Sequence, residues 1–189
     1  MLSQSMRAYL GVQARNLTLI WIALQAAAAI YYIIARLMAQ NWAPEDRPEI
    51  GFAYLFYVWA ALMAVASLLY QRWAFSDARL AKAVREGGPK TVSPAAVMMS
   101  RAAGHGELDE RDKRLAGVYI HLQNSYIITW AFQEAVALVG LVMAIVTRDA
   151  SNVVLFNLAA VGLLFTTRPA PLPFMESAAR LLERGEGGA

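Results

Sequence analysis

Glu134 is the residue of this sequence most able to do chemistry. It lies in an apolar run from Tyr126 to Val146 that holds no other charged residue. About 20 apolar residues are enough to cross a bilayer as an α-helix. A carboxylate inside such a helix costs roughly 2.5–3.5 kcal/mol on insertion scales, so it is protonated, paired or used. The run therefore predicts a membrane helix that carries a candidate ion-binding group.

Small residues follow Glu134 along the same part of the helix. Gln133 lies beside Glu134 and next to a ridge of small residues, namely Ala137, Gly140 and Ala144. Small residues at helical spacing allow another helix to approach closely, so we expect Glu134 to face protein rather than lipid. Removal from water disfavours the charged form, so we expect a neutral carboxyl group at rest.

Two main interpretations of Glu134 stay open at this point. In the first, the carboxyl group exchanges a proton or binds an ion. In the second, it joins two helices through a hydrogen bond, with Gln25 of the first apolar segment or Asn157 of the fourth as its polar partner. Contact with a cofactor or a lipid is a third interpretation.

The stretch Glu134 to Ala144, Glu-Ala-Val-Ala-Leu-Val-Gly-Leu-Val-Met-Ala, resembles the ion-binding helix of the rotor-ring c subunit (proteolipid) of F- and V-type ATP synthases. That family carries a membrane carboxylate followed by small residues, then Gly-Leu and Ala at these offsets. The resemblance covers about 11 of 189 residues. It implies that Glu134 binds H⁺ or Na⁺, with Gln133 as a neighbouring polar ligand. The general layout otherwise resembles that of small four-helix bacterial membrane proteins.

Four apolar segments of helical length position these residues. They predict an all-α integral membrane four-helix bundle, a single membrane domain with spans at about 17–38, 51–70, 118–146 and 153–167. The first segment is too long for the apolar region of a signal peptide, and Arg36 and Met38 replace the small-residue cleavage pattern. We therefore expect an uncleaved first span. The fourth segment is short, so its flanks must complete the span or the bilayer must thin around it.

The basic residues predict the orientation. Fourteen of the 17 lysines and arginines lie before the first span, in the loop 71–117 or in the tail 168–189. The positive-inside rule places these segments, and so both termini, in the cytoplasm. The expected location is the bacterial inner (cytoplasmic) membrane, crossed several times by the chain.

The loop and the tail are expected to be partly helical. The second segment should continue as a helix through Ala74 to Glu86, where Gly87-Gly88 ends it, and Ser93-Pro94 should begin a short helix. Asp109 should cap a helix that runs from Glu110 into the third span. After a break over 169–173, the tail should form a short helix at the membrane interface, with one apolar face made of Phe174, Ala178, Leu181 and Leu182.

Composition limits the chemistry. Hydrophobic residues make up 58% of the chain and charged residues only 16%, and there is no cysteine, which excludes disulfides and thiolate catalysis. His105 to Asp112 contains metal-capable side chains but no recognised ligand spacing, and His121 is expected at headgroup depth. We therefore expect no metal, no cofactor and no enzyme activity. The loop mixes both signs of charge, so lipid headgroups rather than nucleic acid explain its basic surplus.

The sequence thus favours a non-enzymatic integral membrane subunit or scaffold that assembles through small-residue helix seams. Its expected partners are the lipid bilayer and other membrane helices, in a homo- or hetero-oligomer. The alternative is an ion-translocating, c-like proteolipid that carries H⁺ or Na⁺ on Glu134.

Overall fold

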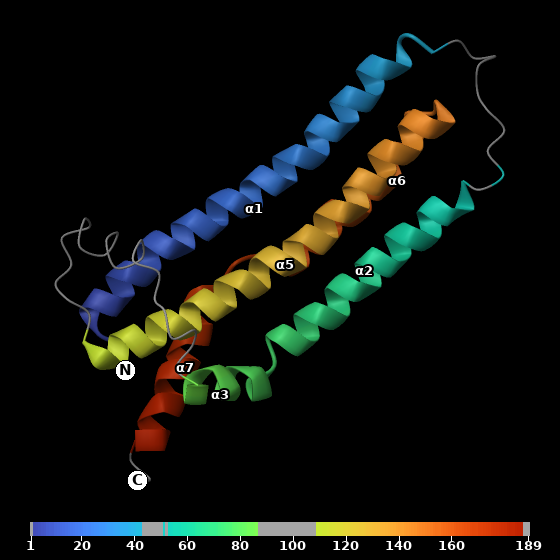
Figure 1. Cartoon of the computed structure of the whole chain (residues 1–189). Coiled ribbons are helices and arrows are strands. Elements are labelled where there is room, and N and C mark those ends of the chain that lie inside the picture. The colour runs from blue at the N-terminus through green and yellow to red at the C-terminus, as the bar shows by residue number, and fades with distance from the viewer. Residues whose placement is uncertain (1, 43–50, 52, 87–108, 187–189) are drawn as a thin grey trace. The chain divides into compact units, whose positions relative to one another are not determined.

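The computed structural model describes residues 2–42, 51, 53–86 and 109–186, and all of the regular structure in these ranges is α-helical. The helices are α1 (Gln4–Ala39), α2 (Tyr54–Ala74), α3 (Asp77–Glu86), α5 (Glu110–Thr147), α6 (Ser151–Thr166) and α7 (Pro171–Glu186) (Figure 1). The predicted all-α class is confirmed.

Within the described residues, four stretches are long and apolar enough to cross a membrane, as the sequence predicts. By length and composition they are Gln4–Ala39, Tyr54–Ala74, Glu110–Thr147 and Ser151–Arg184. The last of these takes in α6 and most of α7. At 1.5 Å per residue, the 16 residues of α6 are about 24 Å long, which is less than a typical hydrocarbon core.

The chain divides into two compact units, and α1 and α5 each contribute residues to both. Unit 2 combines Leu19–Gln71 with Ile127–Arg168. Its interior combines many buried alanines with a few large side chains such as Trp130 and Leu164, and its two buried clusters draw on α1, α2, α5 and α6. The fully or nearly fully buried alanines are Ala28, Ala35, Ala60, Ala137, Ala144 and Ala160.

Unit 1 combines Met1–Thr18, Arg72–Tyr126 and Pro169–Ala189. Its interior contains more large side chains than small ones, including Met6, Leu10, Tyr119, Leu122 and Met175. The rings of Tyr9 and Tyr119 meet edge to face at 6.0 Å, and α3 packs against α7.

Polar contacts also tie unit 1 together. Asp112 is buried and accepts hydrogen bonds from the Ser3 and Ser5 hydroxyls at 2.5 and 3.0 Å. Arg111 of α5 pairs with Glu183 of α7 at 2.6 Å. The N-terminal turn of α1 and the last helix are thus both joined to the start of α5.

The structure corrects one predicted helix and confirms another. The expected continuous helix from the second span to Glu86 is wrong, because the chain breaks at Phe75 and Ser76 before α3 begins. The Ser76 hydroxyl accepts a hydrogen bond from the Arg79 amide at 3.4 Å, so this serine caps α3 and sets the break. The predicted cap at Asp109 is confirmed, since its Oδ1 accepts a hydrogen bond from the Asp112 amide at 2.7 Å. The predictions at Gly87-Gly88 and Ser93-Pro94 lie outside the described residues.

The tail also differs from its prediction. The break predicted over 169–173 is shorter, because α7 begins at Pro171, where the first turn of a helix tolerates proline. Its inner face, Met175, Ala178, Ala179 and Leu182, is buried inside unit 1. Protein therefore covers much of the apolar face that was expected to meet the membrane surface.

Candidate functional site

Glu134 of α5 is half-buried in unit 2 and faces Tyr31 of α1. The Tyr31 hydroxyl is a polar neighbour of the carboxyl group. The other carboxyl oxygen, Oε2, is buried and has no hydrogen-bond partner among the described residues. A half-buried carboxyl group with an unpartnered oxygen retains an unused position for a proton or another ligand.

Gln133 has a different partner, although it is next to Glu134 in the sequence. Its side chain is fully buried, and its Oε1 accepts a hydrogen bond from the Thr167 hydroxyl at 2.9 Å. Successive residues point about 100° apart around a helix, which separates the two side chains. The two residues that the resemblance implies as ion ligands thus have different neighbours. Glu134 lies near Tyr31, whereas Gln133 bonds to Thr167.

The carboxyl end of α6 is where the other three helices of unit 2 converge. The Trp21 indole of α1 donates a hydrogen bond to the Leu164 carbonyl at 2.8 Å. Gln71 of α2 donates to the Thr166 carbonyl at 3.4 Å, and Trp130 of α5 donates to the Thr167 carbonyl at 3.2 Å. The last carbonyls of a helix have no partner within it, so Gln71 and Trp130 supply donors to the Thr166 and Thr167 carbonyls. The Leu164 carbonyl also accepts hydrogen bonds from the Thr167 amide and hydroxyl, so Trp21 is an additional donor there.

Sequence reasoning missed this converging set. The available signal was the position of Trp21 and Trp130 inside apolar segments rather than at their ends. A buried indole N–H usually finds an acceptor, so each tryptophan indicates a nearby carbonyl or polar side chain. The sequence alone did not indicate that both acceptors lie at the end of α6.

The ridge of small residues forms a seam inside the chain, between α5 and α6. A side chain at Gly140 would collide with Phe156 of α6. Ala137 belongs to the same buried cluster as Phe156, and Ala144 belongs to one with Val153 of α6. The close helix approach expected at this ridge is therefore made within one chain.

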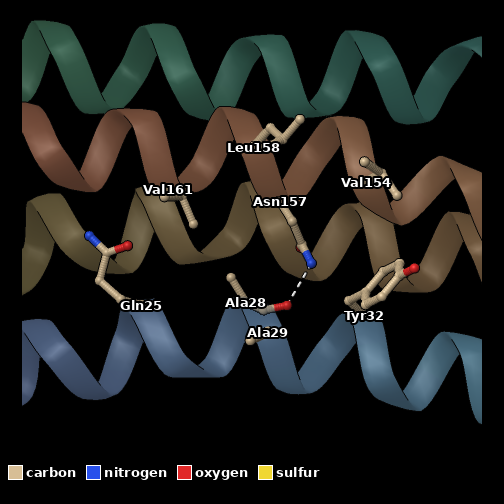
Figure 2. A pocket seen from close by; sticks show the side chains of 8 residues that line it. All are labelled: Gln25, Ala28, Ala29, Tyr32, Val154, Asn157, Leu158 and Val161. Carbon is tan, nitrogen blue, oxygen red and sulfur yellow. Dashed lines mark hydrogen bonds between the residues drawn. The ribbon is translucent and has the colours of Figure 1, made fainter.

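Gln25 and Asn157, the two expected partners of Glu134, lie together in a groove between α1 and α6 (Figure 2). The Asn157 amide nitrogen donates a hydrogen bond to the Ala28 carbonyl at 2.6 Å, as the dashed line in Figure 2 shows. Tyr31, rather than either amide, is the side chain recorded against the Glu134 carboxyl group. Neither Gln25 nor Asn157 is bonded to Glu134 among the described residues.

The chain matches no family model, no curated protein and no solved structure.

Proposed function

We propose that this protein is a non-enzymatic integral membrane subunit or scaffold of the bacterial inner membrane. In this proposal unit 2 is the four-helix bundle embedded in the bilayer, and unit 1 lies in the cytoplasm with both termini. The main support for this proposal is found at the end of α6. There, one side chain from each of α1, α2 and α5 donates a hydrogen bond to a backbone carbonyl. Such contacts fix helices to one another and support a structural role.

The orientation is tested by reporter fusions. The split of basic residues predicts that a reporter fused after Leu182 is cytoplasmic and that one fused after Glu45 is exported. An exported reporter after Leu182 would overturn the proposed orientation. The same fusions test whether an odd number of spans lies between Glu45 and Leu182, as the four-span bundle requires.

Assembly must use a face other than the small-residue ridge, because Phe156 already fills that ridge. The free faces belong mainly to α1 and α2, whose most apolar windows are each only 11% buried. Cross-linking in native membranes tests for assembly. A covalent species larger than one chain supports a subunit role, and a strictly monomeric chain contradicts it.

A second candidate function is ion translocation on Glu134, in the manner of a c-like proteolipid. The observation that favours it is the buried, unpartnered Oε2 oxygen beside the Tyr31 hydroxyl. A carboxyl group that gives up and regains its proton needs a position of this kind.

Dicyclohexylcarbodiimide separates the two functions, because it modifies membrane carboxylic acids that exchange protons. Glu134→Gln is the matched control, since an amide is nearly the same shape and cannot react. Labelling of the parent that is absent in Glu134→Gln favours the ion carrier. Equal background labelling of both proteins favours the structural subunit, in which Glu134 and Tyr31 join α5 to α1.

A further inference from the structure

The groove between α1 and α6 is open on one side and has a volume of about 390 Å³ (Figure 2). Apolar and small side chains make up most of its lining. The lining residues are Gln25, Ala28, Ala29 and Tyr32 of α1, with Val154, Asn157, Leu158 and Val161 of α6. All eight belong to unit 2.

Two amide groups in this groove are incompletely bonded. The Gln25 Nε2 donor and the Asn157 Oδ1 acceptor are buried, and neither has a hydrogen-bond partner among the described residues. Asn157 is only 9% exposed, and the bond from its Nδ2 to the Ala28 carbonyl fixes which way its Oδ1 points. An unpaired buried polar group is costly, so a donor and an acceptor left over in one groove indicate that something else completes them.

The depth of the groove limits what that occupant is. Asn157 lies six residues from the start of α6 and nine from its end, about 9 and 14 Å along the axis. Lipid headgroups lie at the two ends of a span rather than at its middle. At mid-span, the hydrogen-bonding groups available in a membrane are chiefly those of other helices.

We propose that a second copy of this chain occupies the groove, forming a twofold dimer through α1 and α6. In such a symmetric interface, residue i meets residue j of the partner and residue j meets residue i. Gln25, which is half-buried, and Asn157 both turn toward the groove opening about their side-chain torsions as the second copy docks. Gln25 then donates to the partner's Asn157 Oδ1, and the reciprocal bond forms as well. Ala29, which is exposed, is small enough for the α1 backbones to approach closely.

This inference rests on the proposed function, because it names the partner and the face through which the subunit assembles. It also explains why the surplus donor and acceptor are of opposite type. One chain leaves both unpaired, whereas two chains related by a twofold axis satisfy all four groups.

Single-cysteine cross-linking tests the dimer directly, because the chain has no cysteine of its own. Ala29→Cys lies in the groove and is exposed, and Val65→Cys is the matched control, 51% exposed on α2 and outside the groove. Oxidation in native membranes should join Ala29→Cys chains into disulfide-linked dimers and leave Val65→Cys monomeric. Adding Gln25→Leu and Asn157→Leu to Ala29→Cys should lower the cross-linked fraction about tenfold, from the loss of two interhelical hydrogen bonds.

Three outcomes would overturn the proposal. Cross-linking at Val65→Cys but not at Ala29→Cys would move the interface to another face. Unchanged cross-linking after both leucine substitutions would show that the amides do not hold the dimer. If Ala29→Cys stays uncross-linked while the parent runs in a larger complex, the homodimer is wrong but the proposed subunit role survives with a different partner.

Discussion

The two halves of α1 bury opposite kinds of residue. Before Thr18, in unit 1, the buried side chains are large, with Met6, Leu10 and Leu17 at the interior. After Leu19, in unit 2, Ala28 and Ala35 are buried while the isoleucines point outward. One continuous helix thus follows two different packing rules along its length.

Helix α5 repeats the same change. Its unit 1 part buries Tyr119 and Leu122, whereas its unit 2 part buries Ala137 and Ala144 together with Trp130, and leaves Leu138 exposed. In water, burying a large apolar side chain is strongly favourable, so such residues gather inside. Lipid tails are as apolar as leucine, so helices in a membrane associate instead through small residues and hydrogen bonds. The contrast supports water around unit 1 and lipid around unit 2.

The largest loss of unfolding free energy is expected when a large interior side chain of unit 1 is truncated. Leu10→Ala leaves a cavity and should cost roughly 2–5 kcal/mol of unfolding free energy. Val12→Ala, at a position 49% exposed on the same helix, should cost little. Hydrogen exchange of α7, which packs in the same unit, should rise in Leu10→Ala while that of α6 stays unchanged. If α7 exchanged its amide hydrogens equally in Leu10→Ala and Val12→Ala, unit 1 would not depend on the buried Leu10 side chain.

In unit 2, replacing a small interior residue by a large one should lower stability. Gly140→Leu forces a large side chain against Phe156, and overpacking of this kind typically costs about 1–3 kcal/mol. Gly162→Leu is the matched control, because nothing lies within 4 Å of its added Cβ. Thermal denaturation in mild detergent should show a lower Tm for Gly140→Leu only. The seam between α5 and α6 would be wrongly placed if both variants melted like the parent.

A smaller loss is expected from removing one donor at the end of α6. Trp130→Phe keeps an aromatic ring but leaves the Thr167 carbonyl without its indole partner, which should cost about 1–2 kcal/mol. Trp59→Phe, at a position 56% exposed on α2, should stay within about 0.5 kcal/mol of the parent. Melting of both variants in the same detergent measures the difference. A Tm for Trp130→Phe no lower than that of Trp59→Phe would count against the convergence of helices on α6.

The features that were predictable from sequence depend on local signals. The four apolar stretches follow from length and hydropathy, and the cap at Asp109 follows from one side chain and its next turn. Ser76 is a similar local signal for the start of α3. It was missed because we predicted one uninterrupted helix from the second span to Glu86.

The unpredicted contacts join residues far apart in the sequence. Tyr31 and Glu134 are about 100 residues apart, and Trp21 reaches the carbonyl of Leu164. Periodicity places each residue on a helix face but does not say which helix that face meets. The position of the ridge at Gly140 was readable, whereas its partner Phe156 was not.

The contrast between the two halves of α1 is tested most directly by thiol labelling from the aqueous phase. Val12, Ile22 and Ile30 are 49%, 50% and 52% exposed, so the structure alone makes them equally accessible. Each is replaced singly by cysteine, and a membrane-impermeant maleimide is applied to broken membranes. Val12→Cys should react rapidly, while Ile22→Cys and Ile30→Cys should react only after the membrane is dissolved in denaturing detergent. Equal labelling of all three cysteines in intact bilayers would contradict the account.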